Sequence, residues 1–576
     1  MQVYFDTSGS GFKITRENPY FTQSESYTLD VSIPMNILAN RHFFGCLHRK
    51  DCSKVKMSIK CMLRVNNTEV LSGSVKITQV TEKEVKIQLL GGKSEVNFMS
   101  QDNQEYLDKI DLGDVIREID GYSESGRAKY KYSTSNGMKI RVTPVYDETY
   151  DVVKQSPQVG LIDLFHKVIE HYGFTVVGDE IDTIPWNSIY VATAMMTTDI
   201  KATMPHWTVK AFIDEVCTFF NVTLYIDQVK KTVEIRSNRS FKQEKSISIS
   251  PIEEYTAEIS EESKSCISND DIEFSLSSSD SHDYDCIDNE IRKNISRKEF
   301  NSRSEAITAW GNLASNIRSR YVFTCPDGDY ASWMQEPYRG EGQSQEVFTK
   351  IDMFAPLKRE NSDNSKTLKI VPVAMAYIYD QMENNGAEYK MWYNMPSMEN
   401  PAGSASTYFT TGRSGGRRRV QGDALPDNTV QECIEGEGSI EKKEKEDRLQ
   451  VMFIDDTTQT YWEEYSSVRN KWSEYEGSVG FTDFELKPHY KGQAHERWSL
   501  ALSKSNATYY LGQLHENGFA FNTNSKQTFK FISDTMPDPT IIFLIEGKKY
   551  GCEKIEANVN NDGFDKLMTG YFYEML

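Results

Sequence analysis

A short glycine-rich stretch is the first candidate for chemistry in this chain. Leu90-Gly91-Gly92-Lys93-Ser94 ends like a phosphate-binding loop, whose backbone amides hold phosphate oxygens. That loop needs a glycine five positions before Gly92, where this chain has Ile87, and no helical pattern follows. We therefore predict that this stretch is the end of a strand hairpin and binds no nucleotide.

Two other stretches are candidates for a calcium site. Asn558, Asn560, Asp562 and Gly563 imitate the start of an EF-hand loop, but position twelve is Thr569 where a bidentate glutamate is needed. A turn between two strands explains these residues better. The second stretch lacks the loop glycine, and we predict a solvated acidic loop. It carries Asp280, Asp283, Asp285 and Asp288.

Histidines and cysteines give no metal-binding pattern. His166 and His171 are five residues apart on a predicted helix, so their side chains point about 140° from each other and cannot chelate one ion. No cysteines form a CxxC pair, and Cys46, Cys52 and Cys61, with His48 nearby, do not have the spacing of zinc ligands. We predict no metal and no cofactor, with all nine cysteines as thiols of a protein made in a reducing cytosol. These are Cys46, Cys52, Cys61, Cys217, Cys266, Cys286, Cys325, Cys433 and Cys552.

Hydrolytic chemistry has no recognisable signature either. A glycosidase needs two carboxylates across a substrate cleft, and 85 acidic residues neither name nor exclude such a pair. No HExxH motif and no cysteine–histidine peptidase segment is present. We predict that the protein is not an enzyme and has no catalytic residues. The most function-like local feature is a basic, glycine-containing loop with Arg413, Arg417, Arg418 and Arg419, for which a solvated loop or subunit contact is favoured over phosphate binding.

Composition describes a polar, multidomain chain. Its 576 residues are too many for one core, and the absence of a long apolar run predicts no stable membrane insertion. The formal charge of −20 disfavours tight binding of nucleic acid, although an acidic wall suits a conduit through which DNA only passes. Abundant aromatic residues, 31 Tyr and 28 Phe, are typical of β-rich structure.

Alternation of apolar and polar residues predicts β structure in the first ninety residues. A strand is predicted in SYTLDVSIP, and a hairpin turns at Thr81-Glu82-Lys83. The apolar residues of one face are expected to pack together. They are Tyr27, Leu29, Val31, Ile33, Val75, Ile77, Val85, Ile87 and Leu89.

Helical spacing replaces the alternation after residue 156. Ser156 as N-cap and Pro157 at the first helical position introduce an apolar stripe that ends at Gly173, and a strand follows. The pattern recurs 48 residues later, where Thr208 precedes a stripe that ends at Asn221. We predict a small α+β unit over 157–237 with two helix–strand repeats, closed by the hairpin VTLYI/TVEIR. Phe165, Val168, Phe212 and Val216 should anchor it.

Beyond residue 240 the pattern is mostly that of strands and loops. KIRVTPVYD before the helices and LKIVPVAMAYIY after them predict strands, and EAITAWGNLASNIRSRYVFTC predicts a short helix before a strand. Residues 383–448 are rich in Asn, Gly, Ser and Glu, so we expect long exposed loops there. TIIFLIEGKKYGCEKIEANV predicts a tight hairpin around Gly547.

Three segments resemble phage tail baseplate hub proteins. SYTLDVSIPMNILANRHFFG followed by VNNTEVLSGSVKITQVTEKEVKIQLLGG is similar to the N-terminal barrel of that family. The passage from 204 to 237 is similar to the segment that follows this barrel, and the last 37 residues resemble the ending of some tail hub proteins. Residues 380–500 match no segment of the family. The residues that carry the second likeness are Pro205, Trp207, Phe212, Phe220, Asn221 and Asp227.

The resemblance implies a fold and an assembly. The fold class is α+β, mainly β, with two tube-like β-barrels and a small helix–strand repeat domain. Three subunits would form a ring that joins the tail tube to the tip and surrounds a channel for DNA or an effector. The implied partners are a tail tube protein, a tip or spike protein and other baseplate proteins, and the implied location is the tail of a virion made in a bacterial cytoplasm. The predicted domains are 1–150, 151–240, 241–380, 381–500 and 501–576: first barrel, α+β domain, second barrel, loop-rich insertion, and β region completing the second barrel.

Two other functions stay open at this stage. The protein could be a tail-tip or cell-surface binding protein that recognises host glycan or protein through the tyrosine-rich stretches of 383–480, among them MWYNMP and TYWEEYSSVRNKWSEYEG. It could also be a hub with an embedded peptidoglycan hydrolase. Rings or trimers with a central hole favour the hub, glycan binding by monomers favours the second function, and clearing of cell-wall substrate favours the third.

Overall fold

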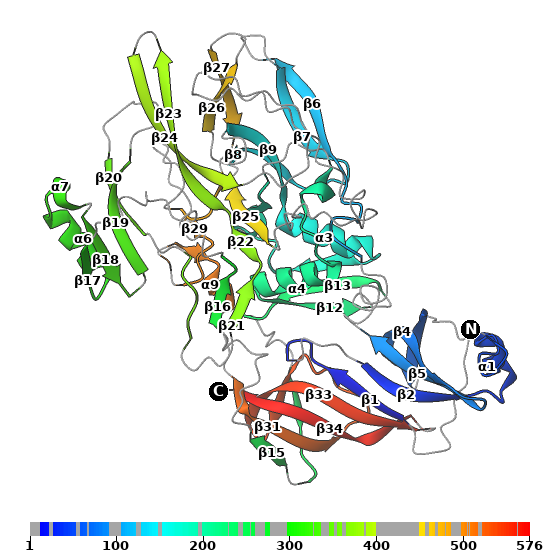
Figure 1. The fold of residues 1–576 in the computed structure, drawn as a ribbon. Helices are drawn as coiled ribbons and strands as arrows, with labels where there is room; N and C mark the ends of the chain where they lie inside the picture. The colour runs from blue at the N-terminus through cyan, green and yellow to red at the C-terminus, as the bar shows by residue number, and fades with distance from the viewer. Residues whose placement is uncertain are drawn as a thin grey trace, which may run out of the picture.

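The fold is taken from a computed structural model of the whole chain (Figure 1). It is mainly β with few helices, so the predicted α+β, mainly β class is confirmed. In the described residues each sheet has an open strand order, and none closes into a barrel. The residues that the structure describes are 12–21, 27–52, 58–65, 68–91, 105–122, 128–147, 152–193, 199–227, 230–239, 246–253, 255–259, 271–276, 296–318, 320–326, 328–335, 345–350, 354–359, 365–384, 387–398, 448–454, 460–466, 471–477, 480–484, 497–503, 505, 507–516, 521–560 and 563–575.

The N-terminal sheet forms where alternation predicted it. Its strand order is β2-β5-β4-β3, and Thr81 closes the β4–β5 turn, because its backbone N–H donates to the Glu84 carbonyl at 2.8 Å. One face buries six of the nine residues predicted to pack together: Val31, Ile33, Val75, Val85, Ile87 and Leu89. Ile77 is partly buried against them, and the side chains of Tyr27 and Leu29 lie outside the described residues. The elements are β2 (Tyr27–Pro34), α1 (Leu38–Phe43), β3 (Ser58–Val65), β4 (Thr68–Val80) and β5 (Glu84–Gly91).

The predicted start of the first long helix is wrong. Ser156 and Pro157 lie within strand β9 (Val152–Gly160), where they pair with Thr143 and Val142 of β8 (Ile140–Asp147). Helix α3 (Leu161–His171) begins after Gly160, four residues later than predicted. Proline lacks one backbone donor but keeps an extended φ, so strand pairing at 156–160 prevails over the capping signal.

The two helix–strand repeats are present, but their strands pair differently. Thr208 caps α4 (Val209–Phe220) by accepting from the Ala211 N–H at 3.1 Å, and Gly173 and Asn221 both have positive φ, as predicted. The strands that follow are β10 (Thr175–Asp179) and β12 (Val222–Asp227). Both pair with β13 (Thr232–Ser237), β10 in parallel and β12 antiparallel. The repeat therefore covers each helix and the strand that follows it but not the pairing of these strands, and β13 joins both strands in one three-stranded sheet.

A large core surrounds these helices and extends to distant parts of the chain. Phe165, Val168, Phe212 and Val216 are all fully buried in it, as predicted. An eight-stranded sheet contributes to this core, in the order β22-β25-β11-β9-β8-β24-β23, with β28 paired to β25. Strands from both sides of residue 241 thus share one sheet. Its other strands are β11 (Ile189–Val191), β22 (Ile370–Pro372), β23 (Ala374–Asn384), β24 (Ala387–Met398), β25 (Leu449–Ile454) and β28 (Gly480–Phe481).

Three long hairpins rise from one end of this sheet (Figure 1). They are β6–β7 (Val115–Tyr122 and Ala128–Thr134), β23–β24, and β26–β27 (Thr460–Ser466 and Lys471–Gly477). The expectation of loops over 383–448 is wrong for 387–398, because these residues form β24 and pair along the whole of β23. Most of the rest of that region, with the four loop arginines, lies outside the described residues.

A small module at the edge of the molecule has its own core (Figure 1). Helix α6 (Arg303–Asn312) and the short α7 (Ser315–Arg318) connect β17 (Ser296–Glu299) to β18 (Tyr321–Cys325), and β19 (Gly328–Gln335) and β20 (Gln345–Lys350) complete a four-stranded sheet. The predicted short helix and strand are therefore confirmed.

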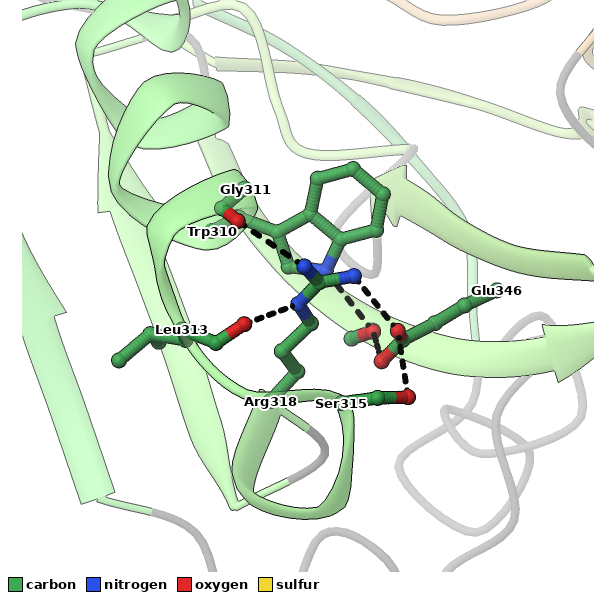
Figure 2. A network of polar contacts seen from close by, with 7 residues as sticks. Trp310, Gly311, Leu313, Ser315, Arg318 and Glu346 are labelled. Carbon is green, nitrogen blue, oxygen red and sulfur yellow. Dashed lines mark hydrogen bonds and ion pairs between the residues drawn. The ribbon is translucent and has the colours of Figure 1, made fainter.

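The module's helices are tied to its sheet by a polar network around Arg318 (Figure 2). Arg318 donates to the carbonyls of Leu313 and Gly311 at the end of α6, at 2.8 and 3.0 Å. Its Nη1 lies 2.7 Å from Glu346 of β20, and its guanidinium lies over the Trp310 ring. The indole N–H of Trp310 donates to the Ser332 hydroxyl, which donates to the same carboxylate, so these hydrogen bonds link α6 to the sheet.

The C-terminal sheet joins the two ends of the described chain. Its strand order is β14-β32-β33-β34-β31-β15, and β1 also pairs with β33. The predicted hairpin around Gly547 is confirmed, with positive φ at both Glu546 and Gly547. Phe12 packs against the cores of both this sheet and the N-terminal sheet. The strands are β1 (Phe12–Glu17), β14 (Ser246–Ile249), β15 (Thr256–Ile259), β31 (Phe521–Ile532), β32 (Ile542–Ile545), β33 (Lys548–Asn560) and β34 (Gly563–Met575).

Short elements fill the space between the sheets. Helix α9 (Gly512–His515) packs near the end of α4, where buried His515 lies 3.0 Å from the Phe219 carbonyl. The remaining elements are η1 (Trp186–Ser188), η2 (Ile200–Thr203), β16 (Asp271–Phe274), β21 (Ser365–Leu368), β29 (Trp498–Ser499) and β30 (Tyr509–Tyr510).

Candidate assembly surface

β14 forms one edge of the C-terminal sheet, and the opposite edge is formed by β15. All four of its residues are exposed, and in the described part of the chain it pairs with β31 alone. Ile259, the last residue of β15, is 84% exposed, and Tyr255, the residue before the strand begins, is 59% exposed. Unpaired backbone groups beside exposed apolar side chains can take another strand, which natural monomers usually prevent with charge, proline or a cover.

A line of charged and phenolic side chains crosses the same sheet. On β33, Glu556 accepts from Lys554 at 2.8 Å and from the Tyr571 hydroxyl of β34 at 3.2 Å, and it also pairs with Lys13 of β1. Glu556 is only 9% exposed, so its charge depends on these donors. We call this line of side chains the ladder. It fixes β1 on the hairpin formed by β33 and β34.

The line continues on the other side toward the edge. Lys526 of β31 lies 3.1 Å from Glu258 of β15 and 4.0 Å from Glu553 of β33. The Tyr573 hydroxyl donates to Glu553 at 3.4 Å. Glu258 is 62% exposed at its side chain, which makes it the solvent end of a ladder whose other carboxylates, those of Glu553 and Glu556, are buried.

Electrostatics keep the inner ladder charged near neutral pH. Burial alone would raise the pKa of Glu556, but hydrogen bonds from Lys13 and Lys554 outweigh it and hold the pKa below the usual range. Burial alone would lower the pKa of Lys554, but the bond to Glu556 and its charge raise it overall. Burial, together with the Glu556 charge, raises the pKa of the Tyr571 hydroxyl. A glycosidase acid needs a raised carboxyl pKa, which is the opposite of what Glu556 has.

Apolar side chains are exposed at the far end of this sheet. Ile532 of β31 and Leu567 of β34 are direct cross-strand partners, 64% and 41% exposed. Ile252, 49% exposed, lies on the adjoining segment, which donates its Ile252 N–H to the Lys530 carbonyl at 3.0 Å. We call β15, Tyr255, Ile252, Ile532 and Leu567 the edge surface.

The other sequence candidates give no chemical site where they are described. Asn560 of β33 pairs with Gly563 of β34, and Thr569 lies inside β34, so the predicted strand-connecting turn is confirmed. His166 bonds to Asp179 at 2.6 Å and His171 to Glu105 at 3.3 Å. Within the described residues, no three His, Cys, Asp or Glu side chains are placed to hold a metal ion.

Several candidates are described only in part or not at all. Leu90 and Gly91 end β5, whereas Gly92, Lys93 and Ser94 lie outside the described residues. Cys46, Cys52, Cys217, Cys325 and Cys552 are free thiols. The acidic loop of 280–288 and the arginine loop of 413–419 lie outside the described residues.

The charged ladder was missed by the sequence reasoning, although a signal for it exists. Lys554 and Glu556 are two apart in β33, as are Tyr571 and Tyr573 in β34, the spacing of residues on one face of a strand. That spacing identifies a polar face but does not say that β1 and β31 add Lys13 and Lys526 to it.

Two comparisons with known proteins found no match. No model of a protein family matches it, and neither does any curated protein. No helix in the described part of the chain is long and apolar enough to cross a membrane.

Proposed function

We propose that this protein is a structural hub of a phage tail or related injection apparatus. In this proposal, copies of the chain meet through the edge surface and line a channel that joins the tail tube to the tip. The observation that carries the proposal is β15: a fully exposed edge strand, with one partner strand in the described residues and a highly exposed isoleucine at its end.

The ladder behind the edge supports a permanent contact. Because Glu556, Lys554, Lys13 and Tyr571 satisfy one another, the sheet can present a rigid edge without unpaired buried charge. The open strand order agrees with tube-like closure by neighbouring copies, since an open sheet gains its missing neighbour from the next subunit. The resemblance in three segments supports the kind of assembly that we propose: three copies around an axis, with tube, tip and other baseplate proteins as partners and the virion tail as the location.

The test is the mass and shape of the purified chain. We expect trimers, and rings with a central hole in negative-stain images, at micromolar concentration. A purely monomeric protein that also fails to join a tail-tube protein would contradict the hub. Clearing of cell-wall substrate by the isolated protein would contradict the prediction of no enzyme activity.

A further inference from the structure

One short segment of the chain lies at both edges of the C-terminal sheet. β14 and β15 follow each other in the sequence, yet β14 pairs in parallel with β32 and β15 pairs antiparallel with β31. Between them, Pro251 forms an antiparallel bridge with Phe531 of β31, two residues after Ile249, which pairs with Ile545 of β32. Two residues span at most about 7 Å, so the sheet curls until β31 and β32 lie on either side of this segment, although its strand order stays open. We call residues 246–253 and 255–259 the clasp.

The clasp contributes little to the core that it covers. None of its side chains is buried, and Ile247 and Ile249 are only partly buried against that core. The Tyr255 ring contacts the Phe529 ring, with centroids 5.8 Å apart. The buried residues of the core come from β1, β31, β32, β33 and β34 and from Met536. Release of the clasp would therefore leave the core residues of these strands in contact, and segments held mainly by exposed backbone pairing are the first to open.

Opposite charges direct the clasp to β31. The charged residues of the clasp are Glu253 and Glu258, and those of β31 are Lys526 and Lys530. Lys530 lies 2.7 Å from Glu253, and Lys526 lies 3.1 Å from Glu258. Both glutamates are more than half exposed, so these pairs add little stability and serve to select the partner strand.

The same charges decide how two copies of the chain can meet at this sheet. Two β15 strands in contact would bring glutamates of two clasps together, and like charges on paired strands are destabilising. A β31 strand without its own clasp offers the clasp of another copy the same backbone partners and the same two lysines. Such a contact joins different surfaces of the two copies, and contacts of this kind close into rings when the rotation between copies allows it.

We propose that neighbouring copies exchange the clasp, so that the clasp of each copy lies between β31 and β32 of the next. This inference rests on the proposed hub function and names the partner of the C-terminal sheet, which is the same segment of a second copy. The exchanged contacts are those made within one chain, so exchange leaves the sheet as it is and links the copies through their backbones.

Cysteine cross-linking of the full-length protein tests the exchange. Thr256 of the clasp and Thr528 of β31 are direct cross-strand partners, and such positions lie within the reach of a disulfide. Thr256→Cys and Thr528→Cys chains with different affinity tags are produced in the same cells and oxidised, and disulfides that join the two tags are quantified on non-reducing gels. We expect at least about tenfold more cross-linked chains than in a matched control, in which Thr308→Cys, at an exposed threonine of α6, replaces Thr528→Cys. Peptide mass spectrometry identifies the disulfide between positions 256 and 528.

A chain with both substitutions, Thr256→Cys and Thr528→Cys, gives the second readout. Exchange should join these chains into covalent multimers, whereas a clasp held by its own sheet gives monomers with an internal disulfide. Thermal melting checks that each variant is folded. Internal disulfides in a protein that still sediments as an oligomer would overturn the exchange and leave the hub standing, and internal disulfides in a monomer would overturn both. Absence of any disulfide at these positions would contradict the pairing of β15 with β31 on which the exchange depends.

Discussion

Two regions of the molecule differ in how much of their apolar surface is buried: the core around helices α3 and α4, and the C-terminal sheet. The first is closed on itself: α3 and α4 bury their apolar stripes, and the buried amide of Gln158 exchanges two hydrogen bonds with the Thr193 backbone, at 2.7 and 3.0 Å. The second buries one face but leaves β15 and Ile259 exposed. Substitutions in the first region should therefore change the stability of the fold, and those at the sheet edge should change assembly.

The largest expected effect is a cavity between the helices. Phe212 is fully buried and makes an edge contact with Phe165, with ring centroids 6.3 Å apart. Phe212→Ala should lower the free energy of unfolding by about 3–5 kcal/mol, as measured by urea denaturation of this region. Ile532→Ala at the 64% exposed edge surface is the comparison and should change it by less than about 0.5 kcal/mol. Equal losses would show that the two regions do not differ as described.

Acid should weaken the closed region through His515. Burial lowers the pKa of His515 from 6.5 to about 4, although the hydrogen bond to the Phe219 carbonyl opposes this. The folded state therefore resists protonation, and stability that is full above pH 6.5 is lost as pH falls toward 4, by about 3 kcal/mol in total.

Unfolding of the parent and of His515→Gln between pH 7 and pH 4 measures this loss. The variant should lose less stability on acidification, because glutamine can still donate to the carbonyl but does not titrate. His42→Gln, at an exposed histidine, should keep the parent's pH dependence. An unchanged drop in His515→Gln would place the acid sensitivity elsewhere.

The peripheral module should depend on the Arg318 network of Figure 2. Arg318→Ala leaves the end of α6 and the Glu346 carboxylate without their main donor, and should destabilise the module by about 1–3 kcal/mol. Hydrogen exchange in α6 measures the effect, with Arg297→Ala as control, since the Arg297–Asp329 pair is exposed at its arginine. If both variants exchange alike, the network does not hold the helix.

A smaller effect is expected from the charged ladder. Glu556→Gln removes the partner of Lys13 and Lys554 and should cost about 1 kcal/mol at pH 7. Because the folded pKa of Glu556 is lowered, its contribution is present above pH 4.5 and is lost as pH falls below that value, so the variant should lose less stability in acid. Glu258→Gln at the exposed end should change stability less. A larger loss of stability in Glu258→Gln than in Glu556→Gln would contradict the assignment of Glu556 as the buried, more strongly held carboxylate of the ladder.

Local patterns predicted the elements better than their partners. Alternation correctly predicted β2 and the β4–β5 hairpin, because one buried face dictates a period of two. The hairpin at Gly547 was correctly predicted from its turn. The cap at Ser156 failed because strand β9 pairs with β8 as far as Val159, and Gly160 still pairs with Tyr190 of β11. The sequence did not predict that β10 and β12 flank β13 in opposite senses, or that β1 pairs with β33 from the other end of the chain, since such pairings depend on contacts between distant segments.

The edge surface was within reach of the sequence only in part. Strands and a charged strand face can be recognised by their two-residue spacing, whereas the exposure of Ile259 follows from how the strands assemble into the sheet. Strand β34 had to be placed against β31 before β15 could be identified as an edge strand. The oligomer and the channel remain predictions for the same reason.

The most direct test of the central claim is sedimentation of the parent protein beside Ile259→Lys over a range of concentrations. Ile259→Ser, which reduces the apolar area without adding charge, is the milder variant. We predict that the parent is a trimer, that association is at least tenfold weaker in Ile259→Lys and intermediate in Ile259→Ser, and that unfolding is unchanged in both variants. The reason is that a charge on an exposed edge strand opposes pairing with another strand, as charges on the edge strands of natural monomers do. A trimer of equal strength in all three proteins, or a parent that stays monomeric at every concentration, would contradict assembly through this edge.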